Sequence, residues 1–243
     1  MAEDKYTDRG VNIETVENSA DYSMSCAHKN EKDFDLLADK YGAAAAERLY
    51  GYMDGVLEWN EHINLTAITD RDEFFNKHIL DSLSAFDSEE FQNASRVIDI
   101  GTGGGFPGVP LAIVAPDKEF VLLDSTKKKL CVINELTSTL RISNVSTVHA
   151  RAEEIGKKPE YAGQFDVCVT RAVADLKILV KWCIPFIKRG GFLIAYKGPK
   201  AKREVASAEK ELFNNKAYVD RIEQVGISET GINEHNLVFI KKR

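Results

Sequence analysis

The alternation of short apolar runs with helical segments between residues 96 and 214 most constrains the fold. Runs rich in β-branched and aromatic residues predict strands at 96–100, 119–124, 145–149, 165–170 and 191–197. Helical segments are expected between and after them, at about 108–115, 126–141, 175–188 and 201–214. Nearly continuous apolar strands that alternate with helices are typical of a parallel sheet covered on both faces. We therefore expect a doubly wound α/β fold.

The flanking segments have different patterns. Apolar residues recur at helical spacing from Phe34 onward, so residues 31–92 are expected to form an N-terminal helical cap. Two runs at 217–225 and 236–241, joined only by a loop, predict an antiparallel hairpin at the sheet edge. Residues 1–30 are polar, acidic and non-periodic, which is typical of a flexible extension. The α/β domain is then expected to span 93–243.

Net charge does not exclude a nucleic-acid partner here. The 243 residues carry a formal charge of −6, which by itself argues against nucleic-acid binding. Residues 1–40, however, hold ten acidic and five basic residues, a balance of −5, which leaves −1 for residues 41–243. The main body is nearly neutral, so a local basic face is compatible with the composition.

Cysteine usage and hydropathy point to the cytoplasm. Cys26, Cys131, Cys168 and Cys183 are widely spaced, with no pair at metal-ligand spacing, so we expect a reduced protein without a metal site. The first residues lack a basic stretch followed by an apolar run, and no segment reaches the roughly 18 apolar residues of a membrane helix. A cytoplasmic protein without membrane attachment is expected.

The turn after the first predicted strand is a ligand-site candidate. It runs from Asp99 to Gly108 and contains glycines at 101, 103, 104 and 105. Glycine lets the backbone turn sharply and approach a ligand without a Cβ atom in the way. In open parallel sheets the ligand lies beyond the carboxyl ends of the strands, where this turn forms the floor.

The glycine spacing leaves two cofactor classes open. Gly103, Gly105 and Gly108 match the dinucleotide fingerprint literally, with Asp124 21 residues after Gly103, which keeps an NAD(P)-dependent oxidoreductase as an alternative. That match is out of register, because counting from Gly101, which closes the strand, puts Phe106 at the third glycine position. No Lys-Ser or Lys-Thr pair follows, which excludes a phosphate-binding P-loop.

The loop and the acid after the second strand instead resemble the S-adenosylmethionine-dependent methyltransferases. In that class the backbone of residues such as Gly101 and Gly103 lies against the methionine part of the cofactor. The acid in the place of Asp124 accepts hydrogen bonds from both ribose hydroxyls, a geometry that suits an ionised carboxylate. Asp124 could also cap the following helix, and the two roles are compatible.

The residues at the end of the fourth predicted strand restrict which kind of atom can accept the methyl group. Methyltransferases that act on exocyclic amino groups carry an Asp/Asn-Pro-Pro-aromatic turn there, whereas residues 170–173 read Thr-Arg-Ala-Val. Methylation at carbon 5 of a pyrimidine needs a thiolate, but Cys168 lies in an apolar run and Cys183 in a predicted helix, as inert core cysteines do. A guanine ring nitrogen with a free lone pair fits better. Its attack requires mainly alignment with the methyl group.

Residues 41–243 resemble the ribosomal small-subunit methyltransferase G family, formerly called glucose-inhibited division protein B. The resemblance rests on separated segments: Trp59-Asn60, Asn64-Leu65-Thr66, His78-Ile79-Leu80-Asp81-Ser82, residues 97–108, Leu123-Asp124-Ser125, Thr170-Arg171-Ala172 and Tyr196-Lys197-Gly198. It implies a Rossmann-like class I methyltransferase fold with a seven-stranded sheet, a cytoplasmic location, and S-adenosyl-L-methionine as cofactor. The implied reaction is methyl transfer to N7 of one guanine in 16S ribosomal RNA. Thr170 departs mildly, because serine is common there.

The same resemblance implies the cofactor contacts. They are Gly101, Gly103, Phe106, Asp124, Ser125, Thr126, Ala152, Glu153 and Arg171. Phe106 would pack on the cofactor, and Ala152 and Glu153 would border the adenine. Arg171 would lie where cofactor and guanine meet. A methyltransferase-fold protein that binds RNA without catalysis is a further alternative.

Two more groups of residues are candidates for the RNA side of the site. Residues 188–203 contain no acid, and their bases predict a phosphate-binding rim for 16S rRNA or the small ribosomal subunit; a solvated helix face is the alternative. These bases are Lys188, Arg189, Lys197, Lys200, Lys202 and Arg203. His78 and Asp81 are expected to face the guanine from the cap. Together with Arg171 they are the catalytic candidates. A helix-capping role for Asp81 is the alternative. A monomer is expected.

Overall fold

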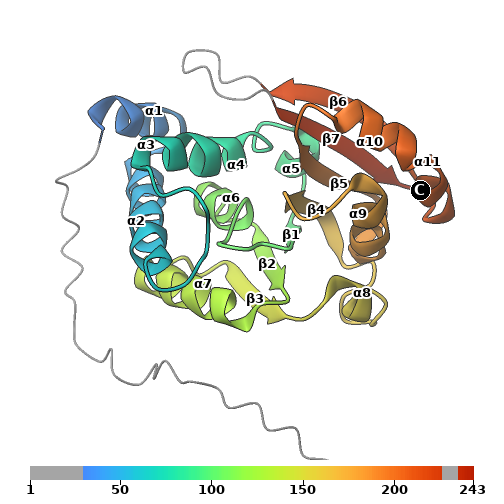
Figure 1. Cartoon of the computed structure of the whole chain (residues 1–243), viewed down its shortest axis with the longest axis horizontal. Coiled ribbons are helices and arrows are strands. Elements are labelled where there is room, and N and C mark those ends of the chain that lie inside the picture. Colours follow the sequence, from blue (N-terminus) through green and yellow to red (C-terminus); the bar gives the residue numbers. More distant parts are fainter. Residues whose placement is uncertain (1–29, 226–234) are drawn as a thin grey trace, which may run out of the picture.

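A computed structural model describes residues 30–225 and 235–243 of the chain. The predicted extension over residues 1–30 therefore lies almost entirely outside the described residues. A seven-stranded sheet with the order β3-β2-β1-β4-β5-β7-β6 forms the centre of the molecule (Figure 1). The strands are β1 (Arg96–Ile100), β2 (Glu119–Asp124), β3 (Val145–His149), β4 (Phe165–Arg171), β5 (Ile187–Lys197), β6 (Ala217–Val225) and β7 (His235–Lys242).

The strand directions confirm the predicted doubly wound sheet. Strands β1 to β5 are parallel, and the chain order reverses between the neighbours β1 and β4. Strand β7 pairs antiparallel with both β5 and β6, so the predicted hairpin lies at the sheet edge. Since ligands bind at such a reversal point, the carboxyl ends of β1 and β4 are where a site is expected.

Successive side chains along a strand point to opposite faces of the sheet. Val97 packs in a core that includes residues of α2 (Ala43–Asn60), α6 (Gly108–Val114) and α7 (Lys127–Thr139). Its neighbour Ile98 packs in a second core with α8 (Ala152–Ile155), α9 (Leu176–Cys183), α10 (Ala201–Ser207) and α11 (Glu209–Asn214). Both faces are covered, which explains why the strands are apolar throughout.

Residues 31–92 contain helices joined by turns and by a loop over 61–70, and no strand, as predicted. Their elements are α1 (Glu31–Tyr41), α2, α3 (Arg71–Phe74), the π-helix η3 (Phe75–Leu80), α4 (Asp81–Leu83) and α5 (Glu89–Gln92). Side chains cap two of them: Asp70 accepts a hydrogen bond from the Glu73 amide at 2.8 Å, and Ser88 accepts one from the Phe91 amide at 3.4 Å. Helix α2 contacts α6 and α7, so the cap packs against the helices that cover one face of the sheet (Figure 1).

Two predicted boundaries are wrong. The helix expected over 175–188 ends at Cys183; the 3-10 turn η4 (Ile184–Phe186) follows, and β5 begins at Ile187 rather than at 191. Pro185 lacks an amide hydrogen, which stops the α-helix there. The helix expected over 201–214 is broken into α10 and α11 at Ala208.

None of the described helices is long and apolar enough to cross a membrane.

Candidate active site at the carboxyl ends of the strands

A pocket of about 490 Å³ opens at the carboxyl ends of β1, β2 and β4. Its walls come from the glycine loop after β1, the ends of β2 and β4, the segment after β3, and η3 of the cap. All nine residues predicted to contact a cofactor line it: Gly101, Gly103, Phe106, Asp124, Ser125, Thr126, Ala152, Glu153 and Arg171. The topology therefore gathers residues from four strand ends into one cavity.

The glycine loop needs glycine at two positions for close approach. Gly101 has φ +74° and Gly105 has φ +89°, in the left-handed region that favours glycine. A Cβ on Gly105 would overlap the Tyr52 hydroxyl, and one on Gly101 would lie 2.5 Å from a Val173 methyl. Tyr52 of α2 also donates a hydrogen bond to the Gly104 carbonyl at 2.9 Å. The cap therefore braces the loop directly.

The Asp124 carboxylate ties the loop to the start of α7. Its Oδ2 accepts a hydrogen bond from the Gly103 amide at 2.9 Å, and its Oδ1 accepts one from the Thr126 amide at 2.8 Å. Thr126, not Asp124, is the N-cap residue of α7, but Asp124 satisfies its amide. Each carboxylate oxygen accepts more than one hydrogen bond, so Asp124 retains acceptor capacity toward the pocket it lines.

A second carboxylate, Asp99, supports the loop from inside the protein. Its Oδ2 accepts hydrogen bonds from the Thr102 hydroxyl at 2.7 Å and from the Gly108 amide at 2.9 Å. Burial raises the pKa of Asp99 to about 7. Its Oδ1 is the only fully buried side-chain oxygen of the described residues without a hydrogen-bond partner. Asp99 thus holds the two ends of the loop together and does not line the pocket.

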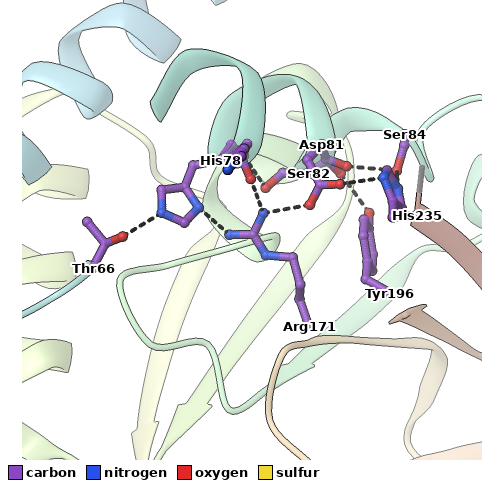
Figure 2. A network of polar contacts seen from close by, with 9 residues as sticks. Thr66, His78, Asp81, Ser82, Ser84, Arg171, Tyr196 and His235 are labelled. Atoms are coloured by element: carbon purple, nitrogen blue, oxygen red, sulfur yellow. Dashed lines mark hydrogen bonds and ion pairs between the residues drawn. The ribbon is translucent and has the colours of Figure 1, made fainter. Parts of the chain in front are cut away.

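An aromatic and cationic wall closes the pocket on the cap side. The His78 ring stacks on Phe106 with centroids 4.7 Å apart and planes 12° apart. The Arg171 guanidinium carbon lies 5.4 Å from the Phe106 centroid, within cation–π range. Arg171 also donates from Nη2 to His78 Nδ1 at 2.7 Å (Figure 2). Phe106 is only 5% exposed, so little of its surface is open to the pocket that it lines.

Both nitrogens of His78 are engaged. Nδ1 accepts from Arg171, so Nε2 carries the hydrogen and donates to the Thr66 hydroxyl at 2.6 Å. Burial and the neighbouring Arg171 charge lower the pKa of His78 to about 3. His78 is therefore neutral near pH 7 and has no free lone pair with which to act as a general base.

Comparison with known proteins identifies the family. Residues 45–234 match the family model for rRNA small subunit methyltransferase G. The chain belongs to that family. It is 44% identical over 191 residues to the Ribosomal RNA small subunit methyltransferase G of Clostridium novyi (strain NT), covering 79% of this chain and 78% of that protein. The same-named protein of Clostridium perfringens (strain SM101 / Type A) is 42% identical over 212 residues, covering 87% and 88%.

The solved structures support the fold. The structure of M. jannaschii TYW2 in complex with AdoMet superimposes with a TM-score of 0.52 at 17% identity, covering 68% of this chain and 75% of that chain. At this identity the similarity shows the fold alone. The seven-stranded sheet of this member of the methyltransferase G family is the class I, Rossmann-like methyltransferase fold expected from the sequence.

Asp81 does not face the pocket of this family member. Its Oδ2 forms an ion pair with Arg171 Nη1 at 2.7 Å, and both side chains are largely buried. Burial raises the pKa of Asp81, but the hydrogen bond from His235 and the Arg171 charge outweigh burial and hold the pKa below its usual range. The expectation that Asp81 contacts guanine is wrong, because the carboxylate points at Arg171 and His235 (Figure 2). It also forms no helix cap.

The predicted basic rim is not a single surface. Lys197 is buried, forms an ion pair with Glu204 at 2.7 Å and donates to the Ala174 carbonyl, so its assignment to the rim is wrong. Lys188 and Arg189 lie at the start of β5, in a second pocket at the amino ends of the strands. Ile187 and Tyr196 of β5 pair with Phe165 and Arg171, which are six residues apart on β4, so Lys188 and Arg189 lie about 20 Å from the carboxyl end of β5. Three exposed bases lie just after that end: Lys200, Lys202 and Arg203.

Several pocket residues were not predicted from the sequence. They are Leu65, Gly104, Lys129, Arg151, Val173 and Trp182, among others. Arg151 adjoins the predicted pair Ala152 and Glu153, so its position could have been extended from theirs. Trp182 lies within an apolar helix and gives no local signal. In the parts of the chain that the structure describes, no three His, Cys, Asp or Glu side chains are grouped as a metal site.

Proposed function

We propose that this protein transfers the methyl group of S-adenosyl-L-methionine to N7 of a guanine in 16S ribosomal RNA. The observation that carries the proposal is the pocket at the β1/β4 reversal, which is lined by all nine expected cofactor residues in a chain of the methyltransferase G family. The names of the relatives supply the ribosomal small subunit as the source of the substrate.

The residues present fit the cofactor. The Asp124 carboxylate, held by the Gly103 and Thr126 amides, would accept hydrogen bonds from the ribose hydroxyls. The glycine loop would lie against the methionine part, and Ala152 and Glu153 would border the adenine. When bound, S-adenosyl-L-methionine supplies an electrophilic methyl group on a sulfonium centre.

The chain's own part in the reaction is alignment. Guanine N7 has a lone pair and no proton, so its attack needs no general base. This agrees with the state of His78, whose two nitrogens are occupied by Arg171 and Thr66. Among its described contacts, Arg171 uses both Nη1 hydrogens and one Nη2 hydrogen, on Lys77, Asp81 and His78. The Nε hydrogen and the second Nη2 hydrogen are left for an acceptor in the pocket.

The setting of the reaction is also a proposal. We expect the enzyme to act in the cytoplasm as a monomer on 16S rRNA or the small ribosomal subunit, without membrane attachment. The exposed bases Lys200, Lys202 and Arg203, close to the carboxyl end of β5, would contact phosphates beside the pocket.

Methyl transfer to small ribosomal subunits tests the proposal. Subunits from cells lacking this protein are incubated with it and with methyl-labelled S-adenosyl-L-methionine, and the rRNA nucleosides are then analysed. Label in 7-methylguanosine is the expected result. Subunit and cofactor binding without transfer would favour the non-catalytic RNA-binding alternative, and binding of NAD(P) in place of S-adenosyl-L-methionine would favour the oxidoreductase.

A further inference from the structure

Arg171 is held by groups that lie on the cap. Its guanidinium donates to the Lys77 carbonyl at 2.8 Å, to Asp81 Oδ2 at 2.7 Å and to His78 Nδ1 at 2.7 Å. These partners lie on η3 and α4, whereas Arg171 ends β4. Only 13% of the Arg171 side chain is exposed, and that part lines the pocket. The orientation of Arg171 therefore depends on how firmly these acceptors are placed.

Asp81, the charged acceptor, is itself held by a hydrogen bond from His235. Its second oxygen, Oδ1, accepts a hydrogen bond from His235 Nδ1 at 2.8 Å (Figure 2). His235 is the first residue of β7, and its side chain is 15% exposed. Neither Asp81 nor His235 lines the pocket. A residue of the C-terminal hairpin thus reaches the pocket arginine through one carboxylate.

The His235 ring has two further contacts that fix its plane. It stacks on Tyr196 of β5, with centroids 6.1 Å apart and planes 15° apart, and its Nε2 lies 3.3 Å from the Ser84 hydroxyl. The Tyr196 hydroxyl in turn donates to the Ser82 carbonyl at 2.6 Å, just after Asp81 (Figure 2). The ring is therefore set to present Nδ1 to Asp81 and not to the pocket.

We propose that His235 is a positioning residue for Arg171. Its Nδ1 hydrogen fixes the Asp81 carboxylate, so that Asp81 holds the guanidinium at the pocket wall in one orientation. A carboxylate with both oxygens bonded to rigid donors has little freedom to rotate. Without His235, Asp81 Oδ1 would be a buried acceptor without its partner, and Asp81 would turn away from the geometry that orients Arg171. The proposal rests on the proposed function, in which Arg171 contacts cofactor or guanine.

Two substitutions separate the hydrogen bond from the packing. In His235→Phe the ring that stacks on Tyr196 is kept and the donor is lost; in His235→Asn an amide donor stands at the place of Nδ1 and the ring is lost. His62, exposed in the turn after α2, serves as the matched control with the same two substitutions. The measurements are kcat and KM for methyl transfer, the calorimetric Kd for S-adenosyl-L-methionine, and the melting temperature.

We expect His235→Phe to lower kcat/KM about tenfold, the scale of one charge-assisted hydrogen bond. Its melting temperature should fall modestly, because Asp81 Oδ1 loses its buried partner. His235→Asn should recover activity to within about threefold of the wild type. In an Asp81→Asn background, His235→Phe should have little further effect, because the residue acts through Asp81. The His62 variants should match the wild type.

Two results would overturn the proposal. One is wild-type kinetics and cofactor affinity in His235→Phe. The other is a loss in His235→Asn at least as large as that in His235→Phe, accompanied by a lower melting temperature, which would assign His235 to packing. If the wild type transfers no methyl group, the proposed function fails; the coupling between positions 81 and 235 in cofactor affinity then still decides the role of His235.

Discussion

Two buried carboxylates at neighbouring strand ends act in different ways. Asp99, in β1, accepts hydrogen bonds from Thr102 and Gly108 through its Oδ2 and does not line the pocket. Asp124, at β2, bonds the Gly103 and Thr126 amides and also lines the pocket. The difference follows from the partners, since only Asp124 combines a rigid backbone cradle with access to the cavity. It is the side chain on which cofactor affinity should depend most.

Replacing Asp124 with alanine should weaken binding of S-adenosyl-L-methionine by at least about 10- to 100-fold, the effect of losing one of the two hydrogen bonds from the ribose hydroxyls. Hydrogen bonds to a charged acceptor contribute about 1.5–3 kcal/mol each, and a tenfold change in Kd corresponds to about 1.4 kcal/mol. Titration calorimetry measures the effect. Asp124→Asn, which keeps one acceptor oxygen, should lose less. An unchanged Kd in Asp124→Ala would contradict the assignment of the ribose site.

The neutral state of His78 should make the protein sensitive to acid. Its folded pKa, about 3, lies below the ordinary value of 6.5, so the unfolded chain takes up the proton first as the pH falls. The stabilisation is fully present above about pH 6.5 and is lost as the pH falls toward 3. Between pH 7 and pH 5 the wild type should lose about 2 kcal/mol more unfolding free energy than His78→Gln.

Urea denaturation at the two pH values measures this difference. His62→Gln is the control, because His62 is exposed and should leave the pH dependence of the wild type unchanged. Equal losses in the wild type and His78→Gln would mean that His78 is not held neutral. The comparison uses the change with pH and not the absolute stability, since His78→Gln also removes the ring that stacks on Phe106.

At the scale of elements, the junction between the glycine loop and α6 has no spare volume. Gly108 begins α6, and a Cβ there would overlap the Leu122 side chain of β2 and lie 2.8 Å from Asp99 Oδ2. Its amide is the one that Asp99 accepts. Helix, loop and strand are therefore packed through one glycine, and the pocket floor depends on this contact.

Gly108→Ala should lower the unfolding free energy by about 2 kcal/mol, in the usual range for overpacking a core. Thermal denaturation followed by circular dichroism measures it. Gly198→Ala is the matched control: among the described residues, apart from the glycine and its two chain neighbours, no atom lies within 4 Å of a Cβ at that position, so its melting temperature should stay near that of the wild type. The close packing of α6 would be refuted by equal melting temperatures in the two variants.

Across the whole molecule, the basic residues predicted for the RNA-binding rim lie at two places, the carboxyl end and the amino end of β5. Lys200 and Lys202 follow the carboxyl end of β5, near the pocket, whereas Lys188 and Arg189 lie at its amino end. Lys188 is also paired with Asp166 at 2.8 Å. An RNA held over the pocket would contact the first pair and not the second.

Reversing the charge of Lys200 and Lys202 to glutamate should raise KM for the small subunit about tenfold and flatten its dependence on salt concentration, because phosphate contacts release counterions. The double variant Lys188→Glu/Arg189→Glu changes the net charge equally and should leave KM unchanged. Methyl-transfer kinetics over a range of salt concentrations distinguish the two. Equal increases in KM in the two double variants would mean that the total charge matters and that RNA does not bind preferentially at the carboxyl end of β5.

Most of the helices and strands were predictable from the apolar pattern of the sequence. Periodicity reports which face of each element is buried, and this predicted the strands, the edge hairpin and the helical segment 31–92. Residues that follow parallel strands meet at one sheet edge wherever the strands pair in order. The nine predicted pocket residues themselves were implied by the resemblance to the methyltransferase G family, and they lie at or after the carboxyl ends of β1 to β4. The division into extension, cap and methyltransferase domain stays a prediction.

The contacts between polar side chains could not be predicted from the sequence. Lys197 belongs to a basic stretch in the sequence, yet Glu204 and the Ala174 carbonyl bury it. Asp81 and His235 lie far apart in the chain, and the pairing of β7 with β5 brings them to the same arginine. Contacts of this kind depend on strand order, register and the packing of the cap, and the local apolar pattern carries no information about them.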